Sequence, residues 1–141
     1  MFHNVKIRVF EREEKDEDVL KGVEALTKLN LKEEKLSLEK VVNKGLENKQ
    51  IFVYTLDLTK KRHVRSFVES INEEIEDKSF KDQENRLDDE LRFFLRFDKE
   101  KLLNNEFKLV EHGDCFHVTC QVAAYPKKKE IAREVIKEVF K

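Results

Sequence analysis

The stretch RLDDELRFFLRFD, from Arg86 to Asp98, contains the clearest structural signal in the sequence. Its large apolar side chains fall at every second position: Leu91, Phe93, Leu95 and Phe97. A period of two predicts a β-strand with one buried face. Four large apolar side chains on that face are enough to anchor a hydrophobic core.

The opposite face of this strand carries Arg92, Phe94 and Arg96. A planar ring between two guanidinium groups suits an unpaired base and its phosphates, because bases stack on aromatic rings and phosphates bind cations. The same pattern suits a solvated sheet surface on which the aliphatic parts of the arginine side chains cover a phenylalanine ring. The strand alone leaves both interpretations open.

Length and charge narrow the classes of protein that this chain can belong to. Its 141 residues are typical of one domain, so we expect a single domain over residues 1–141. With 29 basic and 30 acidic residues the formal net charge is −1, which argues against coating nucleic acid through bulk charge. An anion site would therefore be a local patch. No catalytic motif is recognisable, and the sequence favours a binding domain.

Apolar periodicity predicts five further strands around the first one. They are expected over residues 2–10, 36–43, 50–58, 106–111 and 114–123, the last two as a hairpin that turns at His112-Gly113.

Helices are predicted over residues 16–29, 60–77 and from Pro126 onward, with a short helix over 79–87. Ser79 and Asp82 resemble a capping box for the short helix, and Asp98 is expected to cap a turn through Asn104. This order predicts an α+β fold, a largely antiparallel sheet with the helices packed on one face. The other face is then wet and carries Lys6, Arg8, Arg92, Phe94, Arg96, His117, Thr119 and Gln121.

Two predicted helices begin with the charge that a helix start disfavours. One opens with Lys60, Lys61 and Arg62, followed by Arg65, and the other with the run Lys127 to Lys129. Each cation at a helix N-terminus costs about 0.3–1 kcal/mol at low salt, whereas a bound phosphate would turn that cost into attraction. The alternative is that these side chains extend into solvent or pair with acids such as Glu130 or Glu69.

The cysteines and acids give no strong case for a metal or cofactor. Cys115 and Cys120 fall on opposite faces of one strand, roughly 16 Å apart, too far for a disulfide and poorly placed for one zinc ion with His112 and His117. Asp88, Asp89 and Glu90 could hold magnesium, but such a run is usually a solvated turn. We expect no cofactor, two reduced thiols, a cytoplasmic location and no membrane segment.

Two segments resemble a known family. RLDDELRFFLRFDKEKLL and DCFHVTCQVAAYPKKKEIAREVI are similar to an archaeal RNA-binding family labelled as a predicted exosome subunit, whose members resemble in fold the large-subunit ribosomal protein that holds 5S rRNA. The likeness is best over Arg86 to Ile136. The matching positions are Arg86, Asp88, Asp89, Arg96, Asp98, Lys99, His117, Val118, Ala124, Tyr125, Pro126 and Lys128. The family usually has Gly-Asn where this chain has Glu90-Leu91, and a Gly near Asn104-Asn105.

The resemblance implies binding of structured or double-stranded RNA, without established catalysis. Together with the charge pattern it predicts a non-enzymatic RNA-binding domain with RNA, and RNA-processing or ribosome-related proteins, as partners. The expected contact residues are Lys60, Lys61, Arg62, Arg65, Arg92, Phe94, Arg96, Lys127, Lys128 and Lys129. Two alternatives remain: a protein-interaction or homodimer module that uses the exposed sheet face, and a metal-dependent RNA hydrolase that uses Asp88 and Asp89.

Overall fold

The computed structural model describes all residues from Met1 to Lys141 and contains one five-stranded antiparallel sheet. Its order is β2-β3-β1-β5-β4. The strands are β1 (Phe2–Glu11), β2 (Glu39–Lys44), β3 (Gln50–Leu58), β4 (Arg92–Asp98) and β5 (Cys115–Val122). The α+β prediction is thus confirmed, and the predicted strand within Arg86 to Asp98 forms the edge strand β4 beside β5.

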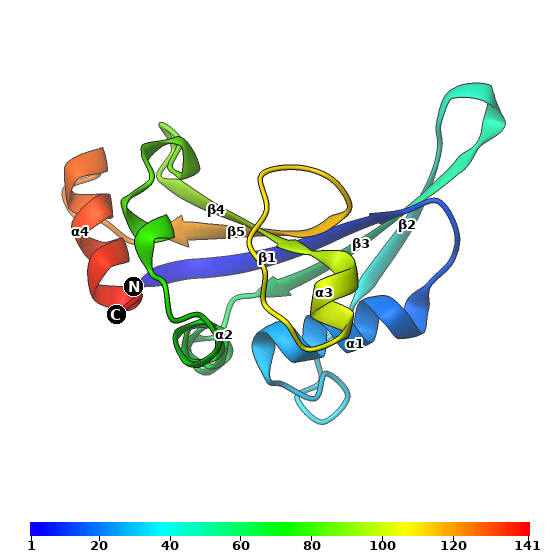
Figure 1. Ribbon diagram of the computed structural model, residues 1–141, viewed down its shortest axis with the longest axis horizontal. Coiled ribbons are helices and arrows are strands. Elements are labelled where there is room, and N and C mark those ends of the chain that lie inside the picture. The colour runs from blue at the N-terminus through cyan, green and yellow to red at the C-terminus, as the bar shows by residue number, and fades with distance from the viewer.

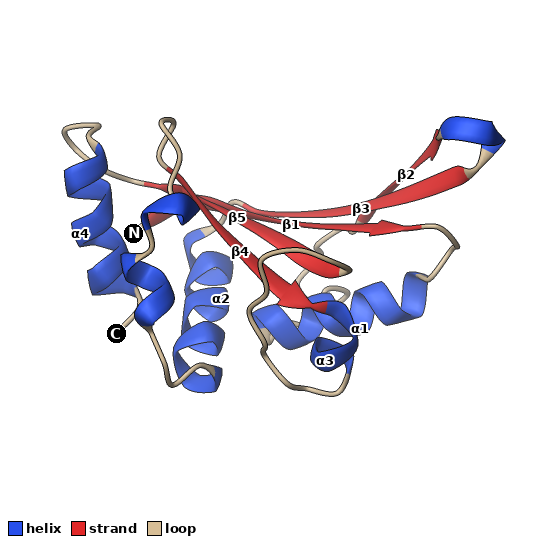
Figure 2. Cartoon of the chain, turned by 45° about the horizontal axis from the view of Figure 1, so that its top comes forward, coloured by secondary structure: helices blue, strands red, loops and turns tan.

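All four α-helices lie on one side of the sheet and leave the other side open (Figures 1 and 2). They are α1 (Asp16–Thr27), α2 (Lys61–Glu74), α3 (Lys99–Leu103) and α4 (Lys129–Val139). A single cluster of 31 buried residues fills the space between the layers. The β2–β3 hairpin extends beyond the helices, and every residue of β2 is exposed. None of the helices is both long and apolar enough to cross a membrane.

Local sequence explains where the helices begin and how closely they pack. The acidic residues at the start of α1 match the helix dipole, and the Asp16 carboxylate also accepts a hydrogen bond from the Tyr54 hydroxyl at 2.6 Å. Gly22 lets α1 approach the sheet, because a Cβ there would lie 2.2 Å from Cζ of Phe116. Asp98 caps α3, as expected, by accepting a hydrogen bond from the backbone N–H of Lys101.

The predicted hairpin of residues 106–111 with β5 is wrong. Residues 108–110 instead run along the outer edge of β4, where the Asp98 N–H donates to the Lys108 carbonyl and the Val110 N–H to the Arg96 carbonyl. The outer edge of β4 is therefore partly covered. Gly113 still supplies a left-handed turn, with φ +94°, before β5 begins.

Several predicted boundaries also change. The second strand begins at Glu39 instead of Leu36, and the short helix resolves into two 3₁₀ turns, Ser79–Asp82 and Glu84–Arg86. No capping box forms, since the Ser79 N–H donates to the Asp77 carboxylate. The last helix begins at Lys129, three residues after Pro126. Prolines suit a first helical turn, but this one forms the bend that leads from β5 into α4.

Candidate nucleic-acid interface

The open sheet face carries the polar side chains that the period of two along the strands predicts there. Strand register places Arg96 of β4, His117 of β5 and Arg8 of β1 side by side in one row across three neighbouring strands. The next row contains Phe94, Thr119 and Lys6 in the same strand order. Residues predicted on separate strands thus form one continuous surface.

The row of Arg96, His117 and Arg8 is strongly electropositive. No carboxylate oxygen lies within 4.0 Å of either guanidinium, so both cations are free to bind an anion. Burial lowers the pKa of His117 below its usual 6.5, and the positive charges of Arg96, Arg8 and Lys99 lower it further. Near neutral pH the imidazole is therefore uncharged, and the row carries two full positive charges.

Two phenylalanines border this row on the open face. Phe10 of β1 is 45% exposed, and its ring meets the His117 ring edge-on with centroids 5.5 Å apart. Phe94 lies on the other side, opposite Thr119. Between them a shallow groove of about 240 Å³ is lined by Lys6, Arg8, Phe10, Phe94, Arg96, His117 and Thr119. Cations and aromatic rings in one groove are the parts from which single-stranded nucleic-acid sites are built.

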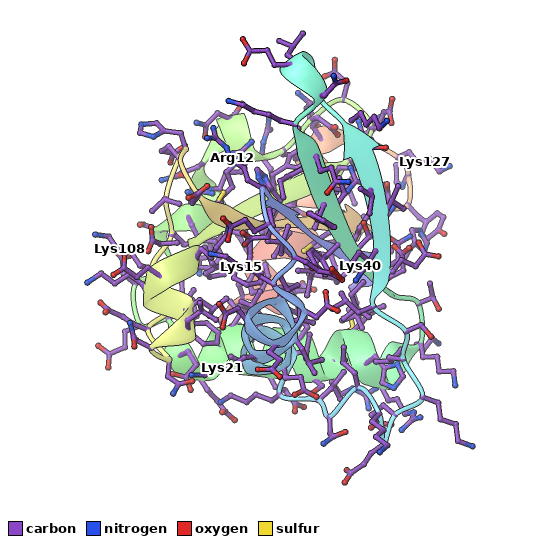
Figure 3. All side chains as sticks on the ribbon, turned by 90° about the vertical axis from the view of Figure 1, so that its right-hand side faces the viewer. Arg12, Lys15, Lys21, Lys40, Lys108 and Lys127 are labelled. Carbon is purple, nitrogen blue, oxygen red and sulfur yellow. The ribbon has the colours of Figure 1, made fainter.

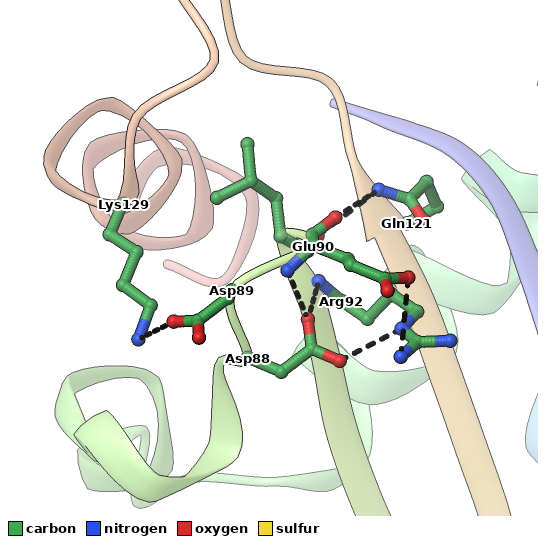
Figure 4. Close-up of polar contacts among 7 residues, drawn as sticks. Asp88, Asp89, Glu90, Arg92, Gln121 and Lys129 are labelled. Atoms are coloured by element: carbon green, nitrogen blue, oxygen red, sulfur yellow. Dashed lines mark hydrogen bonds and ion pairs between the residues drawn. The ribbon is translucent and has the colours of Figure 1, made fainter.

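Arg92 lies on the same face, but its guanidinium is already paired. It contacts the Asp88 carboxylate at 2.8 Å and the Glu90 carboxylate at 3.4 Å, and it lies over the Phe94 ring at 5.9 Å from the centroid (Figure 4). Asp88 also accepts hydrogen bonds from the backbone N–H groups of Glu90 and Arg92, and these bonds with the Arg92 charge lower its pKa despite burial. The Arg92 guanidinium is thus less available to an anion than that of Arg96.

The acidic run Asp88 to Glu90 forms a turn held by cations. Asp89 pairs with Lys129 at 3.0 Å, whereas Asp88 turns toward Arg92, so the two carboxylates are directed to different partners (Figure 4). No group of three or more metal-ligating side chains comes together in the structure. The run connects the start of α4 to the start of β4.

The cations Lys60, Lys61, Arg62 and Arg65 precede α2 or belong to it, and α2 lies on the helix-covered side of the sheet (Figure 2). Lys60 precedes the helix, which begins at Lys61 with no acid in its first turn, as predicted. Arg62 is paired at 2.7 Å with Glu34, which is not among the acids expected as partners from the sequence. Neither Lys61 nor Arg65 has an ion-pair partner within 4.0 Å. These residues and the β4 residues therefore do not share one face.

The lysine run Lys127 to Lys129 spans the end of the connection from β5 and the first residue of α4. Lys127 and Lys128 precede the helix, so only Lys129 stands in its first turn, and the predicted run of three cations inside a helix start is wrong. Lys129 reaches Asp89 beside the first residues of β4 (Figure 4). In Figure 3, Lys127 extends outward at the margin of the molecule opposite Lys108.

Alternation predicts Arg8 and His117 on the wet face, but neither is among the contact residues expected from the sequence. Strand alternation could not reveal that they stand beside Arg96, because adjacency across a sheet depends on strand order and register. Arg86, a family-motif residue, has a structural role: it is 5% exposed and donates to the Phe94 carbonyl at 3.3 Å and to Glu111 at 3.2 Å.

The two cysteines are separated as expected. Cys115 Sγ lies 3.6 Å from His117 Nε2, whereas Cys120 is fully buried in the core. Burial raises the pKa of both thiols, so neither is an activated nucleophile.

Comparison with known proteins identifies a matching family and similar archaeal proteins. A family model described as RNA binding matches residues 4–122. The RNA-binding protein PAB1135 of Pyrococcus abyssi is 30% identical over 141 residues, covering 96% of this chain and 92% of that protein. The uncharacterised protein MJ0213 of Methanocaldococcus jannaschii is also 30% identical, covering 99% of this chain and 95% of that one.

Solved structures show the same fold. Mth689, a DUF54 protein from Methanothermobacter thermautotrophicus, superposes with a TM-score of 0.82 at 28% identity, covering 100% of this chain and 99% of that one. Protein AF2318 from Archaeglobus fulgidus gives a TM-score of 0.80 at 20% identity, with 99% of each chain covered. The family model spans most of the chain, and the first relative matches nearly all of it. The chain therefore belongs to this archaeal RNA-binding family.

Proposed function

We propose that the protein binds structured RNA through the open face of its sheet, by contacts to the backbone and without catalysing a reaction. The observation that carries this proposal is the row of Arg96, His117 and Arg8, where two unpaired guanidinium groups lie beside exposed aromatic rings. Membership of the RNA-binding family supports RNA as the polyanion.

The contacts would begin in the groove and continue toward the end of the sheet. Arg8, Arg96 and Lys6 would bind phosphates in the groove, since the only carboxylate near Lys6 is Asp57 at 3.8 Å. Lys127 and Lys128 would bind further phosphates beyond the start of β4. We keep Lys60, Lys61, Arg62 and Arg65 as a second site that only an RNA wrapping around the sheet edge could reach.

Recognition of this kind would be largely independent of sequence. Paired RNA presents its backbone and shape to a protein, and unpaired bases at loops or ends can stack on exposed rings. Phe94 and Phe10 would take such bases. A role in RNA processing or ribosome-related work in the cytoplasm fits a protein that reads RNA structure, and we propose it on that ground.

The test is a salt-titrated binding assay with a labelled RNA hairpin. Five neutralised phosphates predict that log affinity falls with log salt at a slope of about −3.5 to −4.5. A slope near zero would refute binding through the backbone. Recovery of full-length RNA after incubation with magnesium is expected, and cleavage that an Asp88→Asn/Asp89→Asn variant abolishes would refute the non-enzymatic assignment.

A homodimer through the open face is the weaker alternative. Two copies that pair face to face about a two-fold axis would place the unpaired Arg8 and Arg96 of one copy near those of the other, with no acid to offset them. We expect the monomer mass by light scattering. A dimer that Phe94→Asp dissociates would favour the alternative.

A further inference from the structure

The central row of the open face holds three nitrogen-bearing side chains in one small space. Neighbouring strands lie about 4.8 Å apart, so the Cα atoms of Arg8 and Arg96 are roughly 10 Å apart, with His117 midway between them. All three side chains line the same groove. The two arginine side chains therefore reach the groove from the strands on either side of His117.

The acids near this row are held elsewhere. Asp57 lies nearest to Lys6, and Asp88 and Glu90 are both bound to Arg92. The Glu11 carboxylate at the end of β1 pairs with Lys99 at 2.6 Å and is 7% exposed. The groove thus has an uncompensated charge of about two, which an anion of the same charge would balance.

His117 can add a hydrogen bond without being charged. Its Nε2 lies 3.6 Å from the Cys115 thiol, and a thiol that keeps its proton can donate it to this nitrogen. The neutral ring then carries its own proton on Nδ1 and becomes a donor there. Two guanidinium forks and one imidazole N–H together offer hydrogen bonds from three side chains on three strands.

A phosphate monoester matches this arrangement better than a phosphate diester. A monoester carries about −1.5 to −2 charges at pH 7 and has three terminal oxygens, whereas a diester in a continuous chain carries one charge. Arginine forks bind such oxygens in pairs, which a lysine cannot do. In RNA, monoesters occur only at strand ends.

We propose that Arg8, His117 and Arg96 form a subsite for the terminal phosphate of an RNA strand. The terminal base would rest on the exposed ring of Phe10, which borders the same imidazole. This inference rests on the proposed function and adds to it: the open face would bind RNA backbone in general and would prefer RNAs that end in a phosphate.

The experiment compares one RNA hairpin with a short single-stranded overhang in four forms. These have a 5′-phosphate, a 3′-phosphate, both phosphates or hydroxyls at both ends, with the fluorescent label inside the loop. The wild-type protein is expected to bind one of the singly phosphorylated forms about tenfold or more tightly than the hydroxyl form, as extra charge-assisted hydrogen bonds imply. Equal affinities for all forms would overturn the inference.

The matched variant is Arg8→Lys/Arg96→Lys, which keeps the charge and removes the forks. It should lose most of the preference for the phosphorylated end, measured as the ratio of its affinities for the phosphorylated and hydroxyl forms. A preference that persists in this variant would overturn the assignment to these residues. His117→Gln, which retains a neutral donor, should keep more of the preference than His117→Ala, and equal loss in both would count against the imidazole hydrogen bond.

Competition measurements with small ligands distinguish a failure of this inference from a failure of the proposed function. Adenosine 5′-monophosphate should displace the phosphorylated RNA from the protein better than adenosine does. Inorganic phosphate should displace it less well than the monophosphate. If inorganic phosphate competes as well as the nucleotide, the site takes free phosphate and the RNA-end assignment is wrong. Salt-dependent binding that is the same for all ends refutes only the inference, whereas no binding of any form refutes the proposed function as well.

Discussion

Removal of the two unpaired arginines of the open face should weaken RNA binding in a salt-dependent way. Arg8 and Arg96 have no carboxylate within 4.0 Å, so each would replace counterions at one phosphate when RNA binds. Each neutralised phosphate contributes about 0.7–0.9 to the salt slope, and Arg8→Ala/Arg96→Ala should therefore reduce the slope by about 1.4–1.8. At 0.1 M salt this corresponds to a loss of affinity of about 25- to 60-fold, or roughly 2–2.5 kcal/mol.

The assay is fluorescence anisotropy with a hydroxyl-ended hairpin over a series of salt concentrations. Arg92→Ala is the matched control, because this arginine lies on the same strand and face but is paired with Asp88 and Glu90. Its removal should change the slope by less than roughly half a unit, since little counterion exchange is left for a paired cation. Lys21→Ala in the helix layer should change nothing. An unchanged slope in the double variant, or an equal effect of Arg92→Ala, would refute the reasoning.

Three predictions concern folding stability, measured by urea unfolding. Gly22→Ala should lower the free energy of unfolding by about 1–3 kcal/mol, because its Cβ would meet the Phe116 ring, and adding Phe116→Leu should recover part of the loss. Tyr54→Phe should cost about 1 kcal/mol or more, because the hydroxyl donates to Asp16 and accepts from a backbone N–H at 3.0 Å. His117 has a folded pKa below its usual 6.5, so the unfolded chain binds more protons and stability falls as pH drops through 6.5. His117→Gln should reduce that fall in stability between about pH 7 and pH 5.5, a range well above the one in which the lowered carboxylates titrate. A fall of the same size in the variant and in the wild type would contradict this prediction.

Much of the fold followed from alternation and capping, which are local properties of the chain. A period of two predicts the open-face side chains of β4 and β5, and Asp98 is expected to cap the turn that the structure shows as α3. The failures were tertiary. Nothing local distinguishes residues 108–110 as the outer neighbour of β4 from the same residues as a hairpin partner of β5.

Two departures from the family pattern coincide with unusual backbone conformations. Leu91, where the family usually has Asn after Gly, has φ +62°, and Asn105, near the expected Gly, has φ +61°. Glycine and asparagine adopt this region at low cost, so the family residues suit the turns. Leu91 instead is 7% exposed and contributes to the core. The turn is thus retained although its usual residue is not.

The sequence predicts which cations lie on the candidate interface but not which of them are unpaired, because pairing depends on the acids that lie nearby in the fold. The sequence predicts both Arg92 and Arg96 as contacts, but the Asp88 carboxylate, four residues before Arg92, pairs with the Arg92 guanidinium. Arg62 is likewise expected as a phosphate contact or as the partner of an acid such as Glu69, and the structure pairs it with Glu34 from the loop after α1. Conversely, Arg8 became a candidate only once the register of β1 and β5 placed it beside His117.

The most direct test of the open sheet face as the RNA surface is ultraviolet crosslinking of bound RNA, with the modified peptides identified by mass spectrometry. The account predicts crosslinks at Phe10, Phe94 and His117, on three neighbouring strands, and their loss at high salt. Crosslinks confined to α1, α2 and α3, with none on β1, β4 or β5, would contradict it.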